Sequence, residues 1–356
     1  MQAAGRAALL VVLTAAASAF AAPLTPGVVD APPSPPPVAA PSPLPLTPEQ
    51  ITSQVDPSVV TITAEWGTSG VAGTGFVVDP AGLVLTNYHV IQTAASVTAV
   101  GNGLMYDASV LGYDKTRDLA VLKLDSAAGL PVAVIGRSAD VAVGDAVTAI
   151  GNASGAGVLV PAPGQVVALD KTVTAQSSVD GSRNELTGMI QIDADVRAGD
   201  SGGPLVDAWG SVIGVDAAGL SDEARLTQAP EAYAIPIDIA MTVVDQIREG
   251  RSAGTVHVGP TPFLGVQVRD VSAWNANPSQ GASVVGVEYN SPAERTGLVR
   301  GDVIVSFDGR PVRSSDDLAA EMVGRRPGEI VRLEWVTTTG VRRTQMATLE
   351  TGSPTA

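Results

Sequence analysis

The apolar residues of this chain fall in short, β-branched runs separated by turn residues. Such runs, cut every few residues by Gly, Pro, Asn or Asp, predict many short strands and an all-β barrel or sandwich. The predicted strands before residue 170 are Val59–Ala64, Gly73–Val78, Leu83–Asn87, Val132–Gly136, Ala146–Gly151 and Gly164–Leu169. A hairpin follows, in which Leu205 and Val206 lead into the turn Asp207–Gly210 and the strand resumes at Val212–Val215.

The pattern changes after residue 240. A helix is predicted over Ala240–Glu249, and Gly250–Pro260 is rich in Gly, Ser and Thr, as in a linker. A second, smaller α+β domain is predicted over residues 261–350. Phe263–Val266 opens a strand, Ser291–Leu298 is a short capped helix, and Gly301–Gly309 is a strand that runs into a turn. A further helix is placed at Asp316–Val323.

The first 48 residues lack the pattern of a packed domain. Arg6 precedes an uncharged apolar run, Ala7–Phe20, and Ala19-Phe20-Ala21 fits the cleavage site of a secretory signal peptide over residues 1–21. An uncleaved anchor is the alternative, although the run is shorter than the roughly 20 residues of a spanning helix. Residues 22–48 are mostly Pro, Ala, Ser and Val, which predicts an extended, disordered linker.

Composition narrows the classes of function. A net charge of −15 argues against a nucleic-acid partner, because phosphate binding needs clustered Lys and Arg. The chain has no cysteine, which excludes disulfides, thiolate catalysis and Cys-ligated zinc, and it has only two histidines. We therefore expect neither a metal nor another cofactor.

The most specific motif is Gly199-Asp200-Ser201-Gly202-Gly203-Pro204-Leu205. Glycines around a serine allow a tight turn, and they leave peptide N–H groups free to stabilise an oxyanion, so Ser201 is a candidate nucleophile. The nucleophile elbow of α/β-hydrolases is the alternative. It requires a helix directly after the serine and a histidine downstream, whereas here a hairpin follows and the only downstream histidine is His257 in the linker.

A histidine and an aspartate precede Ser201 in the order of the chymotrypsin triad. His89 follows the strand Leu83–Asn87, and Asp118 comes 29 positions later at the start of another apolar run. A lone histidine or a carboxylate at the start of a strand often has no catalytic role. The triad mechanism, however, needs a histidine upstream of both Asp and Ser, and His89 is the only one available.

These motifs resemble those of the HtrA/DegP family of trypsin-like serine proteases, and most closely its secreted actinobacterial members. The resemblance implies a mainly β, chymotrypsin-like protease domain over residues 49–249, with two perpendicular six-stranded barrels and a catalytic cleft between them. It implies that His89, Asp118 and Ser201 are catalytic, that the N–H groups of Gly199 and Ser201 form the oxyanion hole, and that homotrimers form.

Several positions depart from the family pattern. Asp200 and Asp216 each replace a more usual Asn, and the loop Glu65–Gly70 is short. Asp216, Ala217 and Ala218 occupy the place where the family pairs the substrate backbone. Two alternatives are predicted for the specificity pocket. Either Asp195 lies at its base, as in trypsin-like enzymes for basic substrates, or Val196 lines it.

The strings in the second domain resemble a PDZ domain. In that family the loop that corresponds to Phe263, Leu264, Gly265 and Val266 donates N–H groups to a peptide's terminal carboxylate. Leu318 and Met322, on the predicted helix Asp316–Val323, either face the bound peptide or belong to the helix core.

The sequence therefore predicts an exported serine endopeptidase, secreted or in the cell envelope, that hydrolyses unfolded or damaged proteins and binds peptide C-termini through one PDZ domain. The alternative is an envelope chaperone or holdase in which binding dominates over proteolysis.

Overall fold

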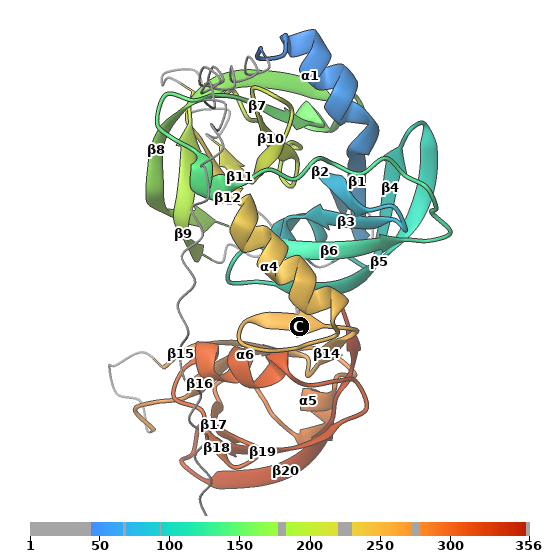
Figure 1. Ribbon diagram of the computed structural model, residues 1–356. Helices are drawn as coiled ribbons and strands as arrows, with labels where there is room; N and C mark the ends of the chain where they lie inside the picture. Colours follow the sequence, from blue (N-terminus) through green and yellow to red (C-terminus); the bar gives the residue numbers. More distant parts are fainter. Residues whose placement is uncertain are drawn as a thin grey trace, which may run out of the picture. The chain divides into compact units, whose positions relative to one another are not determined.

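The computed structural model describes residues 44–66, 69–92, 94–176, 183–219, 230–271 and 278–353 (Figure 1). The predicted signal peptide and nearly all of the Pro-rich segment lie outside the described residues. Helix α1 (Pro48–Val55) begins where the proline content falls. The Thr47 side chain caps its N-terminus, and Gln50 completes a capping box, so the start of the helix is fixed by local sequence.

Six strands close the first barrel. The strands are β1 (Val59–Trp66), β2 (Ser69–Asp79), β3 (Leu83–Thr86), β4 (Ser96–Gly101), β5 (Leu104–Asp114) and β6 (Leu119–Leu124). They pair in the order β4-β1-β2-β3-β6, and β5 pairs with both β4 and β6 to complete the ring. Ile62, Val84 and Leu122 are fully buried inside it. Alternating apolar residues thus face a shared core, as the sequence pattern predicts.

The second barrel is also closed by six strands. They are β7 (Ala146–Gly151), β8 (Val160–Gln176), β9 (Arg183–Ile192), β10 (Pro204–Asp207), β11 (Val212–Gly219) and β12 (Ala232–Pro236), in the order β10-β11-β12-β9-β8-β7. Helix α4 (Ile237–Arg248) follows directly and buries one apolar face. The single turns are α2 (Tyr88–Ile91), η1 (Asp56–Ser58), η2 (Ser138–Asp140) and η3 (Ala153–Gly155).

The prediction of a strand over Val132–Gly136 is wrong. This segment makes only an isolated bridge, between Ile135 and Val212. It is extended but bonds to both barrels: the Ala133 N–H donates to the Val77 carbonyl of β2, and the Val134 carbonyl accepts from the Val212 N–H of β11. This segment therefore connects the two barrels and is not a strand of either one.

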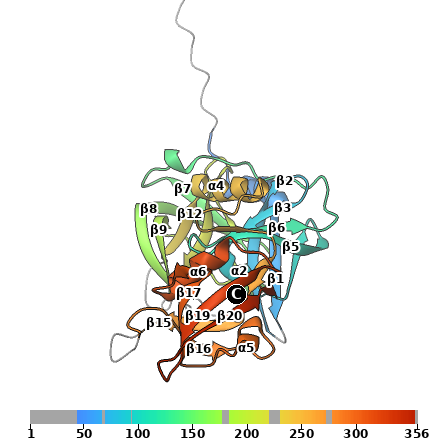
Figure 2. The same ribbon diagram turned by 90° about the horizontal axis from the view of Figure 1, so that it is seen from below.

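The C-terminal domain is a small α+β unit. Its strands are β14 (Thr261–Phe263), β15 (Val266–Asp270), β16 (Ala282–Val287), β17 (Val303–Phe307), β18 (Arg310–Pro311), β19 (Ile330–Val336), β20 (Arg342–Thr348) and β21 (Glu350–Gly352), and its helices are α5 (Pro292–Thr296) and α6 (Ser315–Val323). The main sheet has the order β15-β16-β17-β19-β20, so β15 is an edge strand. Helix α6 contacts β15 and β16, and Figure 2 shows the same elements from below.

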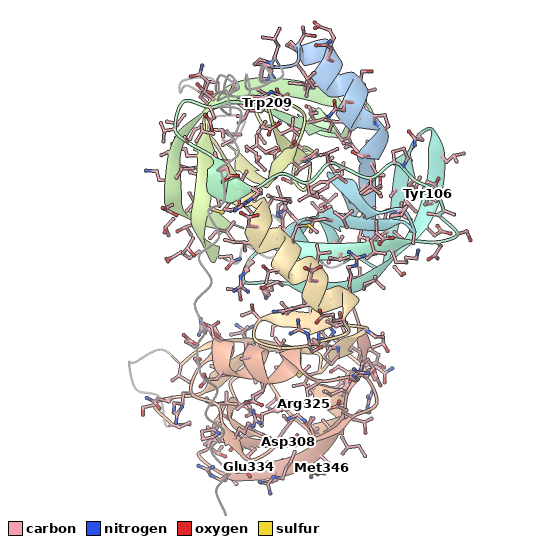
Figure 3. All side chains as sticks on the ribbon, in the orientation of Figure 1. Tyr106, Trp209, Asp308, Arg325, Glu334 and Met346 are labelled. Atoms are coloured by element: carbon pink, nitrogen blue, oxygen red, sulfur yellow. The ribbon has the colours of Figure 1, made fainter. Side chains whose placement is uncertain are left out.

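The core of this domain surrounds Trp335, which is fully buried. Arg325 lies over the Phe307 ring, with its guanidinium carbon 5.2 Å from the ring centroid, and it forms an ion pair of 2.7 Å with Asp308. Arg325 and Asp308 are labelled in Figure 3. The predicted mainly β architecture, with two closed six-stranded barrels followed by a smaller α+β domain, is confirmed.

The segment predicted as a linker contains a strand. Within residues 250–260, β13 (Val256–Val258) pairs with β5 at the edge of the first sheet. His257, in the middle of β13, is buried and stacks against Tyr113 with ring centroids 5.1 Å apart. The His257 ring nitrogens lie 2.7 Å from the Val323 carbonyl oxygen and 3.1 Å from the Gly259 carbonyl oxygen, so backbone groups are the partners of this ring.

Candidate active site

His89 and Asp118 meet at the ends of neighbouring strands. His89 lies in α2, directly after β3, and Asp118 precedes β6, which pairs with β3. The His89 Nδ1 atom is 2.7 Å from Asp118 Oδ2, and the His89 backbone N–H donates to Asp118 Oδ1 at 2.9 Å. The Asn87 amide donates to the Asp118 carbonyl at 2.9 Å. One carboxylate therefore holds both the ring and the backbone of the histidine.

The aspartate acts on the protonation of His89. Burial lowers the pKa of His89, but the charge of Asp118 and its hydrogen bond raise it, and the net pKa lies above the ordinary value of 6.5. Because Asp118 accepts at Nδ1, the neutral ring carries its proton there and Nε2 keeps a free lone pair. This tautomer suits a general base.

The turn that carries Ser201 needs glycine for both conformation and space. Gly199 has φ 99°, and a Cβ there would lie 2.2 Å from the Asn152 carbonyl oxygen. Gly202 has φ 86°, and a Cβ there would lie 2.2 Å from the Thr74 carbonyl oxygen and 3.0 Å from the Asn87 amide nitrogen. The turn is thus packed against the segment that leads into His89.

Hydrogen bonds lock this turn to the first barrel. The Thr74 N–H donates to the Ser201 carbonyl at 2.9 Å, and the Thr74 hydroxyl donates to the Gly199 carbonyl at 2.7 Å. Thr74 is fully buried and also accepts from the Asn152 N–H. Sequence reasoning missed Thr74 as a residue of the site. Its signal was a polar residue between two glycines in an otherwise apolar strand.

The backbone amides of Gly199 and Ser201 point to an oxyanion site. Within the described part of the chain, neither N–H donates to a protein acceptor, although the surrounding amides of Asp200, Gly202 and Gly203 all do. Two unpaired N–H groups on either side of one residue are the donors that a tetrahedral oxyanion requires.

The two residues predicted for the specificity pocket, Asp195 and Val196, have side chains in different environments. Asp195 has a side chain 42% exposed, and its carboxylate pairs with the Arg197 guanidinium at 2.5 Å. Val196 is 3% exposed and packs in the core of the second barrel with Ile190 and Ile213.

The predicted substrate-pairing residues lie in β11. Pairing between β10 and β11 ends at Pro204 and Val215, whereas pairing between β11 and β12 continues to Gly219. Asp216 is completely buried, and its backbone bonds to Gly202 and Gly203. Ala217 and Ala218, beyond the end of β10, therefore face no strand of the described protein on that side. An extended substrate could add there.

The predicted peptide-binding residues of the second domain fall at the start of the edge strand. Leu264 and Gly265 lie between β14 and β15, and neither N–H has a protein acceptor among the described residues. Gly265 has φ 78° and packs against Ser291. Phe263 is partly buried and ends β14, and Val266 begins β15.

Leu318 and Met322 are 4% and 8% exposed and belong to the hydrophobic core of the C-terminal domain. Their burial fits the helix-core alternative, and it leaves their contact with a peptide as a prediction.

Within the described ranges, no group of three or more His, Cys, Asp or Glu side chains is placed to hold a metal ion. In the same part of the chain, no helix has both the length and the hydrophobicity to span a bilayer.

Comparison with known proteins identifies both domains of the chain. The trypsin-like peptidase domain family matches residues 73–215, and the PDZ domain family matches residues 262–337. The putative serine protease HhoA of Synechocystis is 36% identical over 67% of this chain and 61% of its own length. The serine protease PepD of Mycobacterium tuberculosis is 32% identical over 85% of this chain and 65% of its own length.

This chain belongs to the HtrA family of serine proteases. A solved structure of a variant of the HtrA-type protease AlgW with a tripeptide is 27% identical, covers 87% of this chain and 98% of that one, and has a TM-score of 0.50. The match to HhoA and PepD covers less than two thirds of the length of either relative. The HtrA assignment therefore rests on one protease domain and one PDZ domain, in that order.

Proposed function

We propose that this HtrA-family chain is an exported serine endopeptidase that hydrolyses peptide bonds in unfolded or damaged proteins. The observation that supports the proposal most directly is the double contact of Asp118 with His89, beside a glycine-packed turn that carries Ser201.

In the proposed mechanism, His89 accepts the Ser201 hydroxyl proton while the Ser201 oxygen attacks the scissile carbonyl carbon. Asp118 fixes the histidine tautomer and stabilises the imidazolium that forms. The N–H groups of Gly199 and Ser201 donate to the oxyanion. His89 then protonates the leaving amine, and water hydrolyses the acyl-enzyme by the same steps in reverse.

Substrates are proposed to bind in an extended form. The open side of β11 at Ala217 and Ala218 supports addition of a substrate strand, which any unfolded segment can supply. Folded proteins, whose backbone groups are already paired, would be excluded.

The PDZ domain is proposed to bind peptide C-termini. The unpaired N–H groups of Leu264 and Gly265 would hold the carboxylate, and the free edge of β15 would pair with the last residues of the peptide.

An extracytoplasmic location is proposed from the predicted signal peptide and from relatives that carry the name periplasmic, such as the DegP-like endoprotease of Halomonas elongata.

The test is hydrolysis of casein by the purified chain beside a Ser201→Ala control. We expect cleavage by the parent and none by the variant. Cleavage by the variant at the parent rate would contradict the proposed nucleophile. No cleavage by either, combined with suppression of aggregation by both, would favour the holdase.

A further inference from the structure

Two aspartates beside Ser201 have no role in the proposed mechanism. Asp200 is 3% exposed and Asp216 is fully buried. One oxygen of Asp200 accepts from the Arg197 N–H at 2.8 Å, but its other oxygen and both oxygens of Asp216 are buried without a hydrogen-bond partner among the described residues. Burial of an ionised carboxylate with no partner is strongly unfavourable, so such oxygens require either a proton or a counter-ion.

Both aspartates are joined to the nucleophile turn through the backbone. The Gly202 N–H donates to the Asp216 carbonyl at 2.7 Å, and the Asp216 N–H donates to the Gly203 carbonyl at 2.9 Å. The Gly203 N–H donates to the Asp200 carbonyl at 2.8 Å. Because Asp200 precedes Ser201 directly and Asp216 bonds to the two residues after it, a movement of either aspartate moves the turn.

The side chain of Asp200 has little freedom to move away. A Cβ at Gly151, the last residue of β7, would lie 2.5 Å from both Asp200 Oδ1 and its Cα. Asp216 lies in β11 between β10 and β12, opposite Ala234. The unsatisfied oxygens are therefore enclosed by strands rather than turned toward solvent.

Little positive charge is available to stabilise the Asp200 and Asp216 carboxylates. Arg197 is the cation that acts on Asp200, but its guanidinium is bonded to Asp195 at the surface. Other titratable groups that the structure describes on the elements around the two aspartates have partners of their own. These contacts are Tyr233 with Glu231, Asp207 with backbone N–H groups of its own turn, Asp79 with Arg248, and His89 with Asp118.

The electrostatics of the two groups agree with this geometry. Burial raises the pKa of Asp200 to about 6, against the opposing effect of Arg197. Burial raises the pKa of Asp216 well above its ordinary value, and the charge of Asp200 raises it further. Because the charge of Asp200 opposes ionisation of Asp216, the two buried carboxyl groups should lose their protons in separate steps.

We propose that Asp200 and Asp216 are positioning residues for Ser201 that share one proton, so that the carboxyl group of one donates to the carboxylate of the other. This O–H···O⁻ hydrogen bond would occupy oxygens that otherwise have no partner, and it would hold the turn from both sides. Its effect on turnover rests on the proposed role of Ser201 as nucleophile.

The raised pKa values of Asp200 and Asp216 should make the free energy of unfolding depend on pH. Both folded-state pKa values lie above the unfolded value, so the stabilisation is fully present below about pH 4 and is lost as pH rises through the folded pKa values. Loss of the last proton leaves two buried negative charges next to Ser201. Activity should therefore fall at alkaline pH. At acidic pH, activity should fall because His89 becomes protonated and can no longer act as a base.

The test uses Asp200→Asn and Asp216→Asn, singly and together, with Asp193→Asn as the matched control. Asp193 is an exposed carboxylate in the same segment, and it accepts one backbone N–H, from Gln165. Asn keeps the size of the side chain and cannot ionise. Every variant is made both in the active chain and in a Ser201→Ala background, so that stability is measured without self-cleavage.

In the Ser201→Ala background, the unfolding midpoint of the parent should fall between pH 5 and pH 9. Asp216→Asn should flatten this fall and raise the midpoint at pH 9 by roughly 3 °C or more, the effect of about 1 kcal/mol in a domain of this size. Asp193→Asn should follow the parent. Infrared spectra of the parent at pH 7.5 should contain the carbonyl stretch of a protonated carboxyl group, which the double variant lacks.

In the active chain, Asp216→Asn should move the alkaline limb of kcat/KM to higher pH. Asp216→Ala should lower kcat across the whole range with little change in KM, because it removes the hydrogen bond that Asn can still make. Identical pH dependence of the midpoint in the parent and both single Asn variants, or no protonated carboxyl at pH 7.5, would overturn the proposal. The infrared test on the parent requires neither a folded variant nor catalysis, so its result is independent of whether the chain proves to be a protease.

Discussion

At the scale of single residues, the chemistry of the site depends on which groups are charged. Asp118 makes two contacts with His89, and its charge outweighs the burial that would otherwise lower the pKa of the ring. General-base catalysis needs the neutral ring, so kcat/KM should rise as pH increases through a midpoint above 6.5.

Because the chain has only two histidines, NMR can follow the titration of His89 directly, with His89→Ala to assign the signal. Asp118→Asn should bring the pKa of His89 below its parent value, since burial remains after the charge is removed. The same variant should lose on the order of 10⁴ in kcat, because the amide favours the wrong tautomer. An unchanged His89 titration in Asp118→Asn would contradict this electrostatic account.

The preferred residue before the scissile bond distinguishes the two predicted specificity pockets, one with Asp195 at its base and one lined by Val196. Its carboxylate is half exposed and paired with Arg197, which leaves it poorly placed to bind a substrate Arg or Lys. We expect a peptide library to show enrichment of Val, Ala or Leu at that position, unchanged by Asp195→Ala. Enrichment of Arg and Lys that disappears in Asp195→Ala would establish a basic pocket instead.

At the scale of elements, the sequence predicted most strands that carry the site. The alternation of apolar and polar residues predicted β7 with its observed bounds, Ala146–Gly151. Turn residues predicted the β10–β11 hairpin, and this hairpin distinguished a barrel protease from an α/β-hydrolase, in which a helix follows the serine. The strands β4, β5, β19 and β20 were missed, since the sequence reading gave no strand to Ser96–Asp114 or Ile330–Thr348.

Other features of the site depend on contacts that no local pattern reveals. The departures at Asp200 and Asp216 were visible in the sequence, but their burial against one turn depends on how β7, β10 and β11 close a barrel. The hydrogen bonds from Thr74 to the Gly199 and Ser201 carbonyls likewise join residues more than a hundred positions apart. Sequence periodicity cannot report such long-range pairing.

The edge strand β15 carries the prediction for the PDZ domain. Full-length Ser201→Ala chain should bind a peptide with an apolar C-terminus, and amidation of that C-terminus should weaken binding at least about tenfold, because backbone N–H groups lose a charged acceptor. Titration calorimetry with the free and amidated forms of one peptide measures the difference. Equal affinities would reject carboxylate recognition at Leu264 and Gly265.

At the scale of the whole molecule, two closed barrels bring together residues that no single element could position. His89 and Asp118 come from the first barrel and Ser201 from the second, and Thr74 bonds across to the Ser201 turn. The central claim is that this assembly makes Ser201 a nucleophile.

The most direct measurement is covalent labelling with a fluorophosphonate, which reacts with activated serines, followed by mass spectrometry of the intact chain and of its peptides. The account predicts one adduct per chain, located on Ser201, that is absent in Ser201→Ala and strongly reduced in His89→Ala. The control Asp193→Asn should label like the parent. An unlabelled parent, or an adduct on another residue that persists in Ser201→Ala, would contradict the claim.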